Sequence, residues 1–315
     1  MKKLLLGVFV LGCVALVGIY LFIPAKIKLS KLITIKTNPS VAGRFLMDGN
    51  QWVKWSSPDA INAPDAKTGK VTFKFKNHYY HVDRAIMNNA QVSISNTQRS
   101  INSLMALIPI KEDAVAIEWK AEIDAGPNPI SRIKSYTEAK KLGDDMSGIL
   151  SHLKAFLEKK ENAYGLNITE QQVADTILIS TKYLSDTLPS TAKIYSLING
   201  LRKYITKEGA LETNAPMLNI NKESSTYRTM VAIPINKMIP EKNNYVFKRM
   251  VPGRILVAEV KGGDYTARHA LKQLDLYIDD NHLSSPAIPF QSLITDRSME
   301  PDTTKWITKI YYPVY

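Results

Sequence analysis

The stretch IYSLINGLRKYI at residues 194–205 and the stretch ARHALKQLDLYI at residues 267–278 lie 73 positions apart and repeat one pattern. In both, apolar and aromatic residues recur at steps of three or four, which is the spacing of an amphipathic helix. The matched positions are Ile194 and Ala267, Leu197 and Ala270, Ile198 and Leu271, Leu201 and Leu274, Tyr204 and Tyr277, Ile205 and Ile278, and Pro216 and Pro289. A match that keeps helical spacing and extends to a proline beyond each helix indicates an internal duplication.

The same order of elements surrounds each of these helices. A strand is expected before each helix, at 176–183 and at 254–260, and a strand opened by proline follows it. Each copy then ends in a strand with a late proline, IPI at 233–235 and YPV at 312–314. Two strand-helix-strand-strand halves predict an α+β sandwich, with both helices on one face of a mainly antiparallel sheet. The junction between the halves is the expected ligand site, since pockets favour such junctions.

The first half of the chain predicts a separate antiparallel sheet. Alternating apolar and polar residues predict strands at 27–35, 71–76, 92–94 and 115–124. Two Asn-Pro pairs, at 38–39 and 128–129, each combine a helix cap with a proline suited to the first helical position. The first pair predicts a short helix, and the second predicts one long amphipathic helix that ends near Gly165.

The N-terminal run from Leu4 to Ala25 is uncharged, mostly apolar and 22 residues long. As a helix it would span about 33 Å, which is enough to cross a bilayer. The run ends in a poor signal-peptidase site before Lys26. Cys13 lies in a loose match to a lipoprotein box, but nine further apolar residues follow it, which a lipidated N-terminus would not need. We therefore expect an uncleaved transmembrane anchor.

The orientation of this anchor is less constrained, because basic residues flank both of its ends. These are Lys2 and Lys3 before the run and Lys26, Lys28, Lys31 and Lys36 after it. The positive-inside rule therefore acts in both directions. We expect the short N-terminal tail to stay in the cytoplasm and the bulk of the chain to be extracytoplasmic.

The overall composition restricts the class of protein to which this chain can belong. The 315 residues include 41 Lys and Arg against 29 Asp and Glu, a formal net charge of +12. A hydrophobic content of 45% and a charged content of 22% exclude a disordered chain and a polytopic membrane protein. The single cysteine excludes an intramolecular disulfide and a cysteine-rich zinc site. The expected organisation is an anchor at 1–26, one domain at 27–162 and a second at 163–315.

Residues 33–58 resemble the opening of the SRPBCC superfamily, the START-like and polyketide-cyclase-like helix-grip proteins. There a strand leads into an Asn-Pro helix start and then into a Trp-x-x-Trp segment, which Trp52 and Trp55 form here. With the following strands and the long helix, the likeness covers roughly residues 28–160. It implies a hydrophobic cavity and no particular reaction, because this fold carries many activities.

Residues 164–315 resemble the GyrI-like family, an effector-binding domain also found behind the DNA-binding modules of some transcription activators. The likeness rests on Gly263-Asp264-Tyr265, on Pro289 and on the terminal WITKIYYPV at 306–314. It implies a pocket that binds amphipathic, often cationic, aromatic small molecules between the two halves, commonly with acidic and aromatic residues. Some members of the family are proposed to hydrolyse strained electrophilic compounds.

The candidate ligand-binding residues are Glu259, Tyr265, Tyr227, Trp306 and Tyr311. Their aromatic rings with polar tips suit a ligand wall that works by stacking or cation contacts. Glu259 is the remaining acidic candidate, although a carboxylate beside a turn is commonly solvated.

One position departs from the family pattern. An acidic residue often precedes the final Ile-Tyr strand in the GyrI-like family, and this chain has Lys309 there. The departure weakens the expectation that the pocket selects cations.

Other motifs exclude several kinds of chemistry. His78 and His81 are three apart on an expected strand, so they point to opposite faces and cannot share a metal. The glycine pair at 262–263 lacks the spacing of a phosphate loop, and no nucleophile elbow is present. We expect no metal and no cofactor. The lysines are spread along the chain without a helix-turn-helix, which favours a basic surface near anionic lipid over nucleic-acid binding.

These observations favour a membrane-anchored protein that binds or senses a hydrophobic or amphipathic small molecule, through a GyrI-like pocket and a START-like cavity. Two alternatives stay open. One is a hydrolase of electrophilic small molecules in which Glu259 and Tyr265 are the acid-base groups. The other is a non-catalytic interaction module whose cavities are filled with side chains. The oligomeric state is open in all three.

Overall fold

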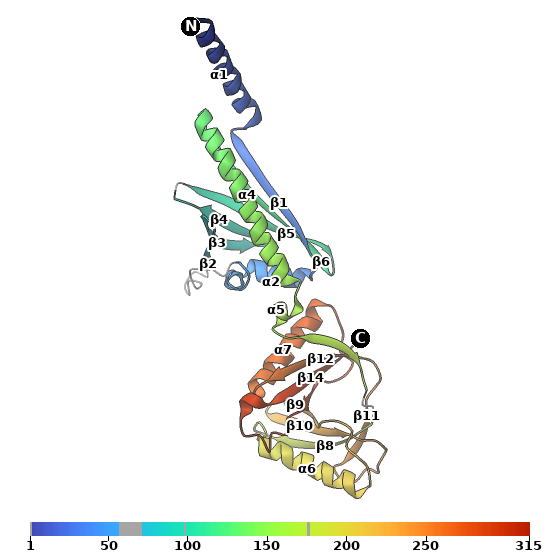
Figure 1. Cartoon of the computed structure of the whole chain (residues 1–315). Coiled ribbons are helices and arrows are strands. Elements are labelled where there is room, and N and C mark those ends of the chain that lie inside the picture. The colour runs from blue at the N-terminus through green and yellow to red at the C-terminus, as the bar shows by residue number, and fades with distance from the viewer. Residues whose placement is uncertain (1, 57–70, 98, 175–176) are drawn as a thin grey trace. The chain divides into compact units, whose positions relative to one another are not determined.

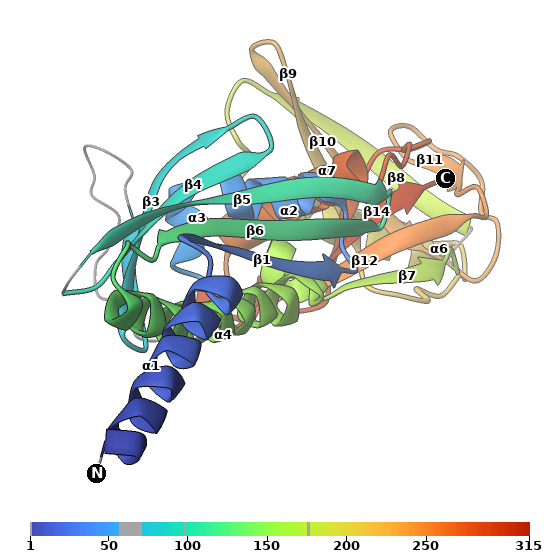
Figure 2. The same cartoon turned by 90° about the horizontal axis from the view of Figure 1, so that it is seen from above.

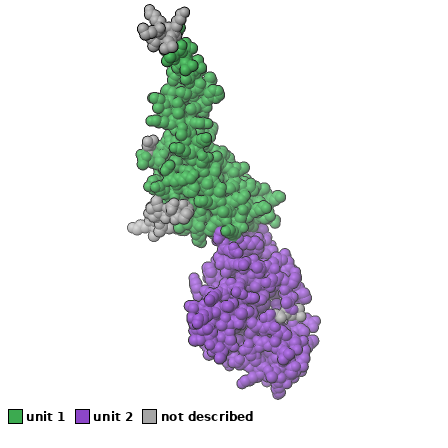
Figure 3. Space-filling view, viewed as in Figure 1, with its two compact units in different colours: residues 1–159 green, residues 160–315 purple. Residues whose placement is uncertain are grey.

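The computed structural model describes residues 2–56, 71–97, 99–174 and 177–315. The chain divides into two compact units, residues 1–159 and residues 160–315 (Figure 3). Each unit contains an antiparallel sheet and helices, so the predicted α+β class is confirmed.

The first unit is built on a six-stranded antiparallel sheet in the order β1-β6-β5-β4-β3-β2 (Figures 1 and 2). Its strands are β1 (Lys26–Ile35), β2 (Val71–Phe75), β3 (His78–Ile86), β4 (Asn89–Ser95), β5 (Ser100–Lys111) and β6 (Ala114–Asp124). Two short helices, α2 (Pro39–Met47) and α3 (Gly49–Trp52), follow β1, and the long helix α4 (Pro129–Leu157) follows β6. From Ile117 to Asp124 of β6, buried residues alternate with more exposed ones, because one face of the sheet is covered and the other is wet.

The two Asn-Pro pairs begin helices as predicted. The side chain of Asn38 accepts a hydrogen bond from the backbone nitrogen of Ser40 at 2.8 Å, and Asn128 does the same for Ile130 at 2.8 Å. The predicted extent of the long helix is wrong, because α4 ends at Leu157 and a separate helix, α5 (Lys160–Tyr164), follows. The residues between them are charged and offer no apolar side chain that a continued helix could bury.

Aromatic side chains fill the interior of the first unit. Trp52, Phe73, Tyr80 and Trp119 are all 0% exposed. The rings of Phe73 and Tyr80 stack at 5.1 Å between centroids, and the rings of Tyr80 and Trp119 meet edge to face at 5.8 Å. The indole nitrogens of Trp52 and Trp119 donate hydrogen bonds inside this core. These rings occupy the covered side of the sheet, where the START-like resemblance implies a cavity.

A buried carboxylate joins α4 to the turn between β2 and β3. Asp145 accepts a hydrogen bond from His78 Nδ1 at 2.9 Å and forms an ion pair with Lys76 Nζ at 2.9 Å. His81 instead contacts the hydroxyls of Thr72 and Ser95. The two histidines therefore have separate partners, and no group of potential metal ligands occurs among the described residues.

The second unit has an eight-stranded antiparallel sheet in the order β11-β8-β10-β9-β13-β14-β12-β7. Its strands are β7 (Ile168–Gln172), β8 (Ile177–Ser185), β9 (Met217–Glu223), β10 (Thr226–Pro234), β11 (Val246–Arg249), β12 (Arg254–Lys261), β13 (Phe290–Leu293) and β14 (Ile307–Val314). The helices α6 (Thr191–Lys207) and α7 (Asp264–Asp280) follow β8 and β12. The predicted strand-helix-strand-strand order is therefore present twice.

The two copies meet at the centre of this sheet, where β9 pairs with β13. In that pairing Leu218 lies opposite Gln291, and these two residues are also 73 positions apart, so the repeat places them at equivalent positions. Both helices cover one face of the sheet. Leu293 packs in the cluster around α6 and lies opposite Thr308. Tyr312 shares the face of Thr308 by strand alternation, and its hydroxyl donates a hydrogen bond to Asp275 of α7.

The N-terminal segment forms helix α1 (Lys2–Phe22). Its end is attached to the start of α4, because the Tyr20 hydroxyl donates to the Pro127 carbonyl at 2.6 Å and Arg132 donates to the Ile23 carbonyl at 2.7 Å. Among the described residues, no helix is both long and apolar enough to cross a membrane. The transmembrane anchor therefore stays a prediction.

The Tyr80 hydroxyl has no hydrogen-bond partner among the described residues although the side chain is fully buried. Replacing Tyr80 by Phe removes an unsatisfied polar group, so we expect Tyr80→Phe to stabilise the first unit by about 1–2 kcal/mol in urea unfolding. Tyr79, which is 40% exposed, provides the matched control, and Tyr79→Phe should leave the stability nearly unchanged.

Burial also raises the pKa of Tyr80 above its ordinary value. The unfolded chain therefore loses the Tyr80 proton first, and the wild type should lose stability as the pH rises above about 10. Tyr80→Phe should reduce this alkaline loss. A destabilised Tyr80→Phe variant at neutral pH would show that the hydroxyl has a partner in solution.

Candidate functional site

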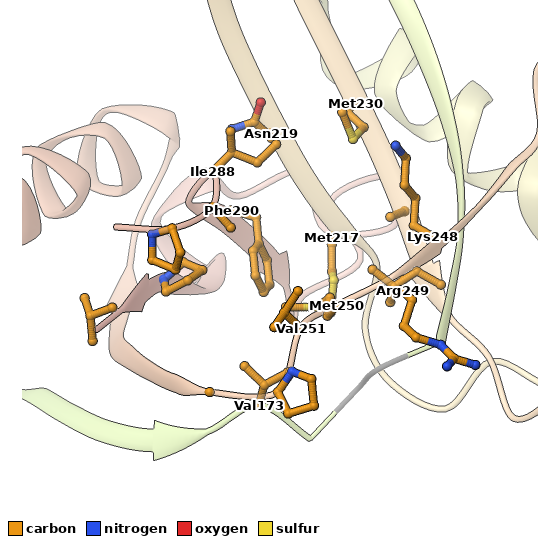
Figure 4. A pocket seen from close by; sticks show the side chains of 18 of the residues that line it. Val173, Met217, Asn219, Met230, Lys248, Arg249, Met250, Val251, Ile288 and Phe290 are labelled. Atoms are coloured by element: carbon orange, nitrogen blue, oxygen red, sulfur yellow. The ribbon is translucent and has the colours of Figure 1, made fainter. Parts of the chain in front are cut away.

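A pocket of about 410 Å³ lies in the second unit (Figure 4). Strands from both halves contribute to it, together with the segments that follow β11 and precede β13. Its lining residues are Val173, Leu178, Met217, Leu218, Asn219, Met230, Ala232, Lys248, Arg249, Met250, Val251, Pro252, Gly253, Arg254, Pro286, Ala287, Ile288, Phe290, Pro313, Val314 and Tyr315. Most of these side chains are apolar, and they come from both halves of the duplicated sheet.

The register of the strands assigns this pocket to the face of the sheet that the helices leave uncovered. Val231 and Ile233 pack against α6, whereas Ala232, which alternates with them on β10, packs with Leu178 and Met217 in a second cluster. Successive side chains of a strand point to opposite faces. The pocket floor therefore lies on the other side of the sheet from the helical core.

A second pocket of about 170 Å³ adjoins the first. Val173, Met217, Met250 and Phe290 line both pockets and so form the wall between them. Methionine side chains have three rotatable bonds and adapt to irregular spaces.

Of the five predicted site residues, Tyr311 lies nearest to this site. It lines the second pocket, and its ring stacks on Phe290 with 5.0 Å between centroids and an angle of 8°. Glu259 lies on β12 opposite Lys309, and their charged groups are 3.7 Å apart. By strand alternation Lys309 shares the face of Tyr311. The carboxylate of Glu259 is thus on the pocket face of the sheet, paired with a lysine and outside the pocket linings described here.

Trp306 is engaged in the protein interior. It is 6% exposed, its indole nitrogen donates to the Glu300 carbonyl at 2.9 Å, and the Arg297 guanidinium lies 4.7 Å from its ring centroid. The cation that contacts this tryptophan is therefore a residue of the chain. Arg297 also donates to Asp264 and to Thr308, both at 2.8 Å.

Tyr265 and Tyr227 lie away from the pocket. Tyr265 is on α7, 74% exposed, and its ring stacks with that of His269 at 6.3 Å. Tyr227 is on β10 at a position that alternates with Met230 toward the helix-covered face, and the Lys222 ammonium lies 5.5 Å from its ring centroid. The structure therefore does not bring Tyr265 and Glu259 together as an acid-base pair.

The sequence analysis missed the residues that form the floor and wall of the pocket, chiefly Met217, Met230, Met250 and Phe290. A signal for two of them was present, because Met217 and Phe290 are 73 positions apart and directly follow the matched prolines. The repeat therefore marks the same pocket position in both halves. Met230 and Met250 carried no such signal. The position of Met230 depends on the register of β10, and that of Met250 depends on the path of the segment that follows β11.

No protein-family model matches the chain, and none of the curated proteins compared with it is similar in sequence. Several solved structures are similar in part. The C-terminal domain of EcmrR is 19% identical with a TM-score of 0.42, over 48% of this chain and 98% of that chain. A START superfamily protein from Mycobacterium smegmatis is 10% identical with a TM-score of 0.31, over 42% of this chain and 97% of that chain.

SAV2435, solved with tetraphenylphosphonium bound, is 15% identical with a TM-score of 0.32, over 47% of this chain and 94% of that chain. At such low identities and TM-scores these likenesses assign neither a ligand nor an activity to this chain.

Arg297 is a buried cation whose burial lowers its pKa. It links α7, β14 and the loop before β14 through the contacts described above, and its backbone nitrogen donates to the Tyr195 hydroxyl of α6 at 2.7 Å. We expect Arg297→Met to destabilise the second unit by about 2–3 kcal/mol, because two charge-assisted hydrogen bonds are lost. Arg268→Met, at an exposed position of α7, is the matched control and should change the free energy of unfolding little.

Proposed function

We propose that the second unit binds an amphipathic small molecule in the pocket of about 410 Å³ on the open face of its duplicated sheet. The observation that carries this proposal is the pocket itself, which falls within the size range of ligand sites and has an apolar lining with few polar groups. The segments after β11 and before β13 supply side chains at its border that stay exposed, including Val251 at 74% and Ile288 at 55%.

The first unit supports this assignment by contrast. Stacked and edge-to-face aromatic rings fill much of its covered sheet face. Its pocket of about 940 Å³ is lined mainly by polar and charged residues such as Arg99, Glu138 and Lys141, so we place binding of an amphipathic ligand in the second unit. Among the described residues no acid-base constellation meets the pocket. The function that we propose is binding or sensing of the ligand.

A matched pair of methionine variants tests the pocket. Met230 lines it, whereas Met238 is 61% exposed and is not among its lining residues. We expect Met230→Trp to fill the pocket and to reduce binding of N-phenyl-naphthylamine, a neutral apolar dye, by about tenfold or more in fluorescence titration. Met238→Trp should bind the dye as the wild type does.

Thermal unfolding of both variants serves as the fold control. Saturating dye should raise the melting temperature of the wild type and of Met238→Trp, but not that of Met230→Trp. A dye that binds all three proteins equally would contradict the pocket assignment.

We further propose that α1 holds the protein at a membrane, with the two units outside the cytoplasm. Support comes from the exposure of large apolar side chains on α1, such as Phe9 at 69%, Leu11 at 74% and Phe22 at 84%. Exposed apolar surface of this extent is costly in water and is suited to lipid. Tyr20, near the end of α1, is a residue type favoured at a membrane interface.

Cell fractionation tests the anchor. The double substitution Leu11→Arg with Val14→Arg should move the full-length protein from the membrane fraction to the soluble fraction, because two charges in the apolar run oppose insertion. The matched control is Leu188→Arg with Leu211→Arg, at exposed positions of the second unit.

The orientation is tested with reporters that are active on only one side of the membrane, fused to the C-terminus. We expect the reporter for the extracytoplasmic side to be active. Activity of the cytoplasmic reporter would overturn the orientation.

A further inference from the structure

Resting on the pocket proposed above, we propose that its ligand is an anionic amphiphile, with one hydrocarbon chain in the pocket and a carboxylate or phosphate head at Lys248. This differs from the cationic aromatic ligand that the GyrI-like resemblance implies. Charge, strand register and pocket shape each contribute to the argument.

The charged side chains that line the pocket are all basic. Lys248, Arg249 and Arg254 line it, and no aspartate or glutamate is among its described lining residues. Arg254 forms an ion pair with Glu170 at 3.4 Å. Glu259, the acidic candidate from the sequence, lies outside this lining and faces Lys309. A cationic head would therefore meet no carboxylate side chain among the described lining residues, whereas an anionic head would meet basic side chains.

Strand register selects Lys248 among the basic residues. Lys248 lies opposite Leu178, which belongs to the apolar cluster of the pocket floor. Arg249 lies opposite Ile177, which packs against the α6 cluster on the other face. Directly opposed residues of antiparallel strands point to the same face. The ammonium of Lys248 is thus on the pocket face, and in Figure 4 it extends toward Met230.

The apolar part of the site suits a flexible chain. Met217 and Met250 separate the pocket of about 410 Å³ from the second pocket of about 170 Å³. Because methionine side chains change conformation readily, a hydrocarbon tail can extend from one pocket into the other. Phe290 and Val173 continue the same apolar wall on both sides of this partition.

The experiment uses the full-length protein in detergent-free lipid nanodiscs and measures displacement of N-phenyl-naphthylamine. Four competitors share one twelve-carbon chain: dodecanoate, dodecyl phosphate, dodecanol and dodecyltrimethylammonium, each below its micellar concentration. Empty nanodiscs with the same dye provide the correction for partition into lipid. We expect dodecanoate or dodecyl phosphate to displace the dye at about five- to tenfold lower concentration than the neutral and cationic chains. The better of the two anions distinguishes a fatty-acid head from a phospholipid-like head.

Two variants assign the preference to one side chain. Lys248→Gln should remove the anion preference, and Lys248→Glu should shift the preference toward dodecyltrimethylammonium. Lys203→Gln, at an exposed position of α6 on the other face of the sheet, is the matched control and should keep the wild-type order. The preference should also shrink as salt is added, because the ion pair is partly exposed.

The outcomes separate the two proposals. Dye binding with equal displacement by all four chains, or an anion preference that survives in Lys248→Glu, would overturn the anionic assignment while the pocket stands. Failure of the dye and of all four chains to bind the folded protein would overturn the pocket itself.

Discussion

The proposed site depends on the short pairing of β9 with β13. Two register pairs join the halves there, Leu218 with Gln291 and Met217 with Ser292. Because side chains alternate along a strand, this one pairing fixes both faces of the sheet at once. Leu218 enters the core beneath α6, and Met217 enters the floor of the pocket. A slip of one residue would exchange these two faces.

The two faces of the duplicated sheet have different physical roles. The helix-covered face is closed by apolar packing and by the buried guanidinium of Arg297, which holds α7 and β14 together through fixed hydrogen bonds. The open face is lined by methionines, a stacked Phe290 and Tyr311 and loop residues that stay exposed. A rigid layer thus supports an adaptable one, an arrangement suited to ligands that are bound mainly by shape and hydrophobic contact.

The first unit uses its aromatic residues differently. Tryptophan, tyrosine and phenylalanine rings pack on one another beside its sheet, with indole nitrogens satisfied internally. The buried Asp145 then ties the β2–β3 turn to α4 through His78 and Lys76. These contacts join the helices of the first unit to its sheet and stabilise its fold.

The sequence by itself determined the α+β class, the two Asn-Pro helix starts and the duplication, because helical spacing, cap chemistry and repeats are local or periodic properties of the chain. It also marked the equivalence of Met217 and Phe290. The tertiary structure alone decided which of the predicted aromatic residues line a pocket: Trp306 contacts Arg297 in the interior, whereas Tyr311 lines the second pocket. It also decided the charge of the site, because strand register places Lys248 on the pocket face and pairs Glu259 with Lys309. The strand register and the path of the segment after β11 depend on contacts between residues far apart in sequence, and no local pattern encodes them.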